Sequence, residues 1–109
     1  MANFFKNKVI KGVGRELIQV LETDGSTKTT VLGISFTNLT SSNVFCNVLV
    51  HDDTSVEGYY LKDTLLPPNT SLRAMMGGEK LIIAPNNQMY VSTDTDDSAD
   101  VVVSYVEIV

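Results

Sequence analysis

The chain of 109 residues is long enough for one domain with a modest hydrophobic core. Hydrophobic residues make up 43% of it and charged residues 19%, which favours a compact module over a disordered tail. The net charge of −5 argues against a nucleic-acid-binding protein, because neutralising phosphates requires a basic face. The single cysteine, Cys46, excludes a disulfide within the chain, and its apolar neighbours indicate a small buried residue.

The first fifteen residues carry only positive charge. The cations are Lys6, Lys8, Lys11 and Arg15, which give +4. The other 94 residues hold 4 cations and 13 acids, which is −9. We expect residues 1–14 to form a basic N-terminal arm and residues 15–109 to form the domain. Such an arm is either a solvated terminus or a tether to an acidic neighbour, for instance a second copy of the chain.

Beyond the arm, eight short runs rich in apolar and β-branched residues are separated by turn residues, at a spacing of roughly 8–12 residues. The predicted strands are 15–22, 29–39, 44–51, 57–62, 71–76, 79–84, 88–93 and 100–109. With no sustained helical period, this pattern predicts an all-β fold: a single antiparallel β-sandwich of about eight strands, jelly-roll-like or immunoglobulin-like. Strands 29–39 and 44–51, joined by the polar residues 40–43, form the strongest predicted hairpin.

The last strand is the one around which the predicted sheet is built. Both of its alternating sets of side chains are mostly apolar, because Val102, Val106 and Ile108 oppose Val101 and Val103. A strand with two apolar faces must be covered on both. We therefore expect it to lie centrally in its sheet, packed on a second sheet or on another subunit.

The sequence contains only weak indications of a catalytic site or a metal site. The one histidine, His51, lies at a strand end, and no nucleophile with an oriented base accompanies it, so we expect no enzyme. The acidic run 94–100 resembles a calcium loop in its first five positions. However, Ala99 and Tyr105 stand where the sharp-turn glycine and the bidentate glutamate belong. We interpret the run as a solvated hairpin tip, with a structural cation as the alternative, and expect no metal or cofactor.

Two pairs of large consecutive residues, Tyr59–Tyr60 and Met75–Met76, indicate contacts with other proteins. Consecutive strand residues point to opposite faces, so one member of each pair should leave its own core. Outward tyrosine and methionine favour protein–protein contact, and packing under a loop is the alternative. The predicted interaction residues are these pairs and the cations of the arm: Lys6, Lys8, Lys11, Arg15, Tyr59, Tyr60, Met75 and Met76.

Four segments of the sequence resemble small virion structural proteins of tailed bacteriophages, of the type that infects marine bacteria and cyanobacteria. Residues 30–40 (TVLGISFTNLT) are similar to the pattern T-V-x-G-I-x-x-x-N-x-T, and residues 66–72 (LPPNTSL) to V-P-x-G-S-S-L. Residues 77–83 (GGEKLII) resemble G-G-x-K-x-V-L, and residues 99–108 (ADVVVSYVEI) resemble S-x-D-V-V-x-S-V-L-E-I. Asn69 replaces the usual glycine after the prolines.

The resemblance implies a non-enzymatic β-sandwich that is built in many copies into a virion. We therefore expect a capsid decoration (cement) protein that binds the capsid surface as a homo-oligomer. The implied partners are the major capsid protein or other virion subunits, and neither nucleic acid nor a membrane. Since no secretory signal or membrane-spanning run is seen, assembly in the bacterial host cytoplasm is expected. A neck or tail structural protein and a carbohydrate-binding module of a tail fibre are the alternatives.

Overall fold

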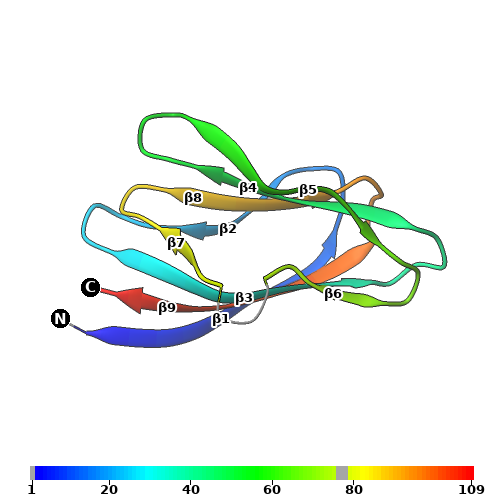
Figure 1. Cartoon of the computed structure of the whole chain (residues 1–109), viewed down its shortest axis with the longest axis horizontal. Coiled ribbons are helices and arrows are strands. Elements are labelled where there is room, and N and C mark those ends of the chain that lie inside the picture. The colour runs from blue at the N-terminus through cyan, green and yellow to red at the C-terminus, as the bar shows by residue number, and fades with distance from the viewer. Residues whose placement is uncertain (1, 76–78) are drawn as a thin grey trace.

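The computed structural model describes residues 2–75 and 79–109, which contain nine β-strands and no helix. The strands are β1 (Asn3–Val13), β2 (Ile18–Glu22), β3 (Lys28–Asn38), β4 (Val44–His51), β5 (Glu57–Leu66), β6 (Ser71–Arg73), β7 (Leu81–Ile83), β8 (Gln88–Thr93) and β9 (Ala99–Ile108). They form two antiparallel sheets packed face to face, visible as two layers in Figure 1. The predicted all-β sandwich is confirmed. Within the described part of the chain, no helix has the length and apolar character needed to cross a membrane.

The order of the strands distinguishes between the two predicted kinds of sandwich. Sheet A runs β1-β9-β3-β6, with β7 also paired to β3, and sheet B runs β2-β8-β4-β5. The chain therefore passes from one sheet to the other between β1 and β2, between β2 and β3, and between β3 and β4. An immunoglobulin sandwich instead keeps its first two strands in one sheet. The observed order is that of a jelly roll, in which two Greek keys are wound into a pair of sheets.

The predicted hairpin between residues 29–39 and 44–51 is wrong, although both strands are present. β3 pairs with β9, β6 and β7 in sheet A, whereas β4 pairs with β5 and β8 in sheet B. The polar segment 40–43 crosses between the layers instead of turning within one. Local alternation identifies each strand but carries no information about its partner, so the pairing follows from the whole fold.

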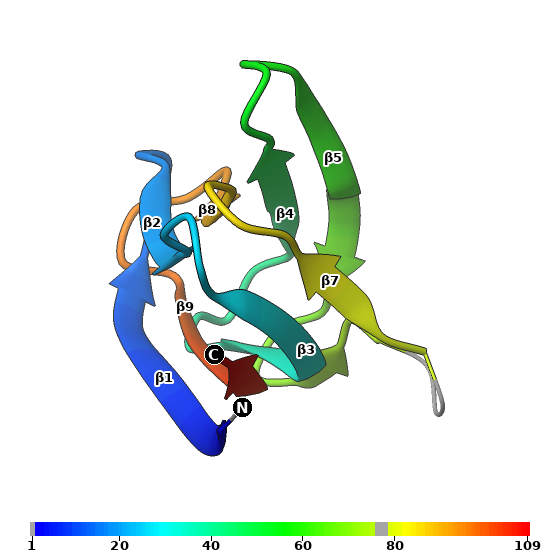
Figure 2. The same cartoon turned by 90° about the vertical axis from the view of Figure 1, so that its left-hand side faces the viewer.

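Residues 1–14, which the sequence predicts to be an arm outside the domain, instead contribute a full strand to it. β1 pairs along its length with β9, from Asn3 opposite Ile108 to Val13 opposite Ala99. Backbone hydrogen bonds between Ala2 and Val109 then join the two ends of the chain, which lie side by side in Figures 1 and 2. The lysines obscure this strand in the sequence because β1 is an edge strand, where charged side chains are tolerated on both faces.

β9 lies centrally in sheet A, between β1 and β3, as predicted. Its inward residues Val101 and Val103 are fully buried, and they pack in one core with Phe36 of β3 and with Val48 and Val91 of sheet B. The core is therefore the space between the two sheets, filled from alternate positions of each strand.

A buried asparagine fixes the two crossings at one end of the sandwich. Asn38, at the end of β3, donates hydrogen bonds from Nδ2 to the carbonyl oxygens of Ser42 (2.8 Å), Leu66 (3.0 Å) and Pro67 (3.1 Å). Its Oδ1 accepts bonds from the backbone N–H and the hydroxyl of Thr40, both at 2.8 Å. One side chain thus ties the β3–β4 crossing to the end of β5 and the β5–β6 crossing. We call this arrangement the Asn38 junction.

The backbone around the Asn38 junction explains the residue after the two prolines. Asn69 has a positive φ of 52°, and its N–H donates to the carbonyl oxygen of Thr40. Glycine adopts such a backbone most easily, and asparagine is among the few other residues that tolerate it. Asn69 therefore preserves the conformation that the glycine of the resembling pattern would supply.

Candidate interaction surface

Three of the four N-terminal cations form ion pairs within the chain. Lys6 Nζ lies 2.6 Å from Glu107, Lys11 Nζ lies 3.7 Å from Asp100, and Arg15 lies 2.8 Å from Asp96. The hydrogen bond and the charge of Glu107 raise the pKa of Lys6. These ion pairs neutralise, within the domain, much of the positive charge that a free arm would present to a neighbouring protein. The role of these cations in docking remains a prediction.

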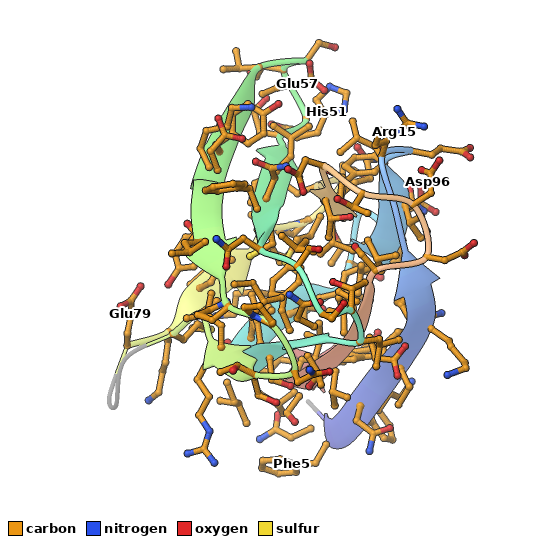
Figure 3. The ribbon with its side chains drawn as sticks, turned by 90° about the vertical axis from the view of Figure 1, so that its right-hand side faces the viewer. Phe5, Arg15, His51, Glu57, Glu79 and Asp96 are labelled. Carbon is orange, nitrogen blue, oxygen red and sulfur yellow. The ribbon has the colours of Figure 1, made fainter. Side chains whose placement is uncertain are left out.

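The acidic segment 94–100 binds protein groups in place of a cation. Backbone N–H groups of Phe45, Arg15 and Gly12 donate to Asp94, Asp96 and Asp100, over 3.0, 3.1 and 3.0 Å respectively. The Arg15 side chain adds a second bond to Asp96, which lowers the pKa of that carboxyl (Figure 3). The sequence predicts a hairpin tip here, but the segment instead crosses from β8 in sheet B to β9 in sheet A. Because Asp94, Asp96 and Asp100 turn to different partners, they join this crossing to β4 and to the end of β1.

The β8–β9 crossing closely approaches the backbone that follows β1. A Cβ added at Gly14 would lie only 2.9 Å from Cα of Asp96, so a side chain does not fit there. Beneath this contact, the buried hydroxyls of Thr93 and Ser98 bond to one another at 2.8 Å, and Ser98 Oγ donates to the carbonyl oxygen of Val13. A shallow hollow beside Gly14 is lined by Glu16, Ile18 and the Asp96 and Asp97 residues of the crossing. The tight packing here serves to hold β1 in place.

The groups considered for catalysis are not brought together in the described residues. Cys46 is fully buried in the core, as predicted, and desolvation raises the pKa of its thiol to about 11. His51 of β4 lies opposite Glu57 of β5 in sheet B, on the side of the molecule away from Phe5 (Figure 3). No cluster of three or more potential metal ligands occurs in residues 2–75 and 79–109, and every fully buried side-chain nitrogen or oxygen there has a partner.

The tyrosine pair divides between the two faces of sheet B. Tyr59 points outward, with 52% of its surface exposed, and Lys62 Nζ lies 4.7 Å from its ring centre. Tyr60 packs against the core, and its hydroxyl donates a hydrogen bond to Glu79. Desolvation and this carboxylate raise the pKa of Tyr60 to about 12. Of the methionine pair, Met75 is buried in the core, and Met76 lies outside the described residues.

An exposed apolar surface includes residues that were not singled out in the sequence. It is the outward face of sheet A, where Phe5 of β1 lies opposite Val106 of β9, Val106 opposite Thr30 of β3, and Thr30 opposite Ile82 of β7. Four residues further along β1 from Phe5, Val9 lies opposite Val102. We call this surface the outer A face; its apolar members are Phe5, Val9, Leu32, Ile82, Val102 and Val106. The two-sided apolar pattern of β9 was the signal that predicted such a surface.

The outer A face is unusual in both exposure and charge. Phe5 is 78% exposed and points away from the sandwich, as Figure 3 shows, and Ile82 is 48% exposed. The polar positions among the apolar ones are uncharged, for example Asn7, Ser35 and Ser104. An exposed apolar patch without charge at its centre is typical of a protein–protein contact.

Comparisons with known proteins concern the fold. No protein-family model matches the sequence, and no curated protein matches it. Among solved structures, the chain is similar to a chain of the T13 IBDV viral particle, with a TM-score of 0.56 and 9% sequence identity. The similarity covers 96% of this chain and 30% of that one, so this sandwich spans about a third of the viral chain's length. At this identity the likeness shows a shared fold.

Proposed function

We propose that this chain is a structural virion protein of a tailed bacteriophage, and specifically a capsid decoration protein that coats the capsid surface in many copies. The observation that carries the proposal is the Asn38 junction. It brings together residues 38–40 and 66–70, which belong to two of the four segments that resemble phage virion proteins. These two segments are far apart in the sequence, yet they meet at one buried side chain and therefore constrain each other. Their joint resemblance supports a relationship to phage virion proteins more than a chance similarity would.

The fold agrees with this proposal without establishing it. Jelly rolls form many viral capsid domains, and the IBDV particle contains a chain with a similar fold. The same architecture also occurs in lectins and enzymes, so the fold alone does not define the function, and the surface of the sandwich is the better guide. In the described residues the fully buried side-chain polar atoms all have hydrogen-bond partners, whereas the outer A face offers apolar area to another protein. A protein built this way acts by binding subunits.

The proposal is tested by the composition of the particle. Phage particles purified on a density gradient are analysed by quantitative mass spectrometry for peptides of this chain. A capsid decoration protein is expected in a copy number comparable to that of the major capsid protein. A copy number lower by an order of magnitude or more would indicate the neck or tail, and absence of the chain from the particles would contradict a virion role.

A tail-fibre carbohydrate module is the second candidate, because Tyr59 presents an exposed ring on the outward face of sheet B. Sugars stack on exposed aromatic rings, yet Lys62 already occupies the vicinity of this one. A glycan array with the purified chain distinguishes the two functions. Binding that disappears in Tyr59→Ala would favour the carbohydrate module, whereas an array without hits is expected for a decoration protein.

A further inference from the structure

We infer that the outer A face is the contact between two copies of this chain, which pack sheet A against sheet A around a twofold axis. This inference concerns the chain itself and does not rest on the proposed function. Three features of the face support a second copy as its occupant: its charge, its area and its shape.

Charge favours this face over every other contact between copies. Each copy carries a net charge of −5, so two copies repel one another in most orientations. The central outward positions of β1, β9, β3 and β7 carry no charged side chain. Lys28 and Arg73 lie at the borders of the face, and Asp100 is paired with Lys11. Two such faces meet without burying a like-charge pair.

The outward face of sheet B carries charge both at its border and further in. At one end, His51 lies opposite Glu57, and Glu22 ends the same row. Away from that end, the Lys62 ammonium lies 4.7 Å from the centre of the exposed Tyr59 ring. Pairing of β1 edges is also disfavoured. In an antiparallel β1–β1 contact centred near Asn7, Lys6 and Lys8 of the two copies would stand beside each other.

The area of the face matches the need of a stable dimer. Three strands, β1, β9 and β3, each contribute about nine residues, and the fourth position is shared by β6 and β7, which have three residues each. At about 4.8 Å between strands and about 3.3 Å per residue, the surface is about 520 Å². Two copies would bury about 1,050 Å² in total, at the level of roughly 1,000 Å² expected of a specific interface. Sheets pack well in this manner, at a separation of about 10 Å.

The shape of the face is self-complementary. Phe5 protrudes at the β1 edge, whereas Gly33, Ser35 and Ser104 form a floor of small residues near its middle. A Cβ added at Gly33 would meet no atom within 4 Å, so the space above this floor is open. In a twofold contact the phenylalanine of each copy can fill the floor of the other, as an isologous interface requires.

Sedimentation equilibrium of the purified chain at about 10–100 µM tests the inference. The wild type is expected to be a dimer. Phe5→Glu and Ile82→Glu, at opposite edges of the face, should each raise the dimer dissociation constant at least tenfold, because each copy contributes the substituted residue. Leu65→Glu is the matched control, since Leu65 is 46% exposed on the outward face of sheet B, and it should leave the dimer unchanged.

Circular dichroism and melting temperature confirm that the variants fold, as expected for residues so exposed. Because the contact lacks charge at its centre, raising the salt from about 0.05 to 0.5 M should not weaken the dimer. A monomeric wild type at 100 µM, a dimer that both face variants leave intact, or a dimer that Leu65→Glu alone disrupts would each overturn the inference. The composition of phage particles, which tests the proposed function, is unaffected by these outcomes.

Discussion

Replacing Asn38 tests how strongly a single side chain holds the crossings of the sandwich together. Asn38→Ala removes five hydrogen bonds and leaves the carbonyl oxygen of Leu66 without its buried donor. An unsatisfied buried group costs about 1–3 kcal/mol, and the bonds nearer the surface contribute about 0.5–1 kcal/mol each. Near the lower end of these ranges, the buried group and the four other bonds together give an expected loss of unfolding free energy of about 3–4 kcal/mol, a large part of the 5–15 kcal/mol typical of a domain.

Urea unfolding followed by circular dichroism measures this loss, and at about 4 °C per kcal/mol the melting temperature should fall by about 15 °C. Asn38→Asp separates hydrogen bonding from packing, because it keeps the volume but turns a carboxylate oxygen toward three carbonyl oxygens. It should destabilise at least as much. Gln19→Ala, at an exposed amide of β2 outside the outer A face, is the control and should change stability by less than about 0.5 kcal/mol. A loss below about 1 kcal/mol in Asn38→Ala would refute the structural role of the Asn38 junction.

Three further experiments, at Gly14, Cys46 and Asp96, test the attachment of β1 and the burial of the core. Gly14→Ala should cost about 1–3 kcal/mol because its Cβ would meet the backbone of Asp96, whereas Gly58→Ala, where the added Cβ meets open space, should be close to neutral in the same urea titration. Cys46 should react with a thiol reagent at pH 8 only as fast as the domain unfolds, and full reaction within seconds in the native state would contradict its burial. The lowered pKa of Asp96 means that its contribution to stability is complete above the unfolded value of about 3.9 and is lost as the pH falls through the lower folded value. Asp96→Asn should therefore lower stability slightly at pH 7 and reduce its acid dependence below pH 4; an unchanged acid profile would contradict the Arg15 pairing.

The positions of the strands could be predicted because strand residues alternate in polarity and turns use a few residue types. β4 and β8 were predicted to the residue, and β9 to within one. The central place of β9 followed from its two apolar faces. Strand positions depend on the local order of residues, and the central place of β9 depends on how many of its faces are apolar, so both can be predicted from the sequence.

Pairing could not be predicted because it depends on contacts between distant residues. β3 and β4 look like a hairpin, yet the Asn38 junction directs the chain from one sheet to the other between them. β1 was mistaken for an arm because its lysines dominate its composition. The acidic partners of these lysines, Glu107 and Asp100, come from the far end of the chain, and only the register of β1 on β9 reveals them.

Candidate interaction residues show the same division. Strand alternation predicted that one tyrosine of the pair points outward, and the structure shows that this is Tyr59, whereas Tyr60 packs against the core. The outer A face combines single residues of four strands, and Phe5 and Ile82 are far apart in the sequence. Neither is conspicuous by itself, so the surface appears only when the strands are placed in register.

Electron cryomicroscopy of the intact phage particle, with the chain traced in the map, tests the central proposal most directly. We expect copies of this sandwich on the outside of the capsid, repeated with its symmetry and held by contacts between surfaces. A particle whose capsid, neck and tail contain no density for this jelly roll would contradict the proposal.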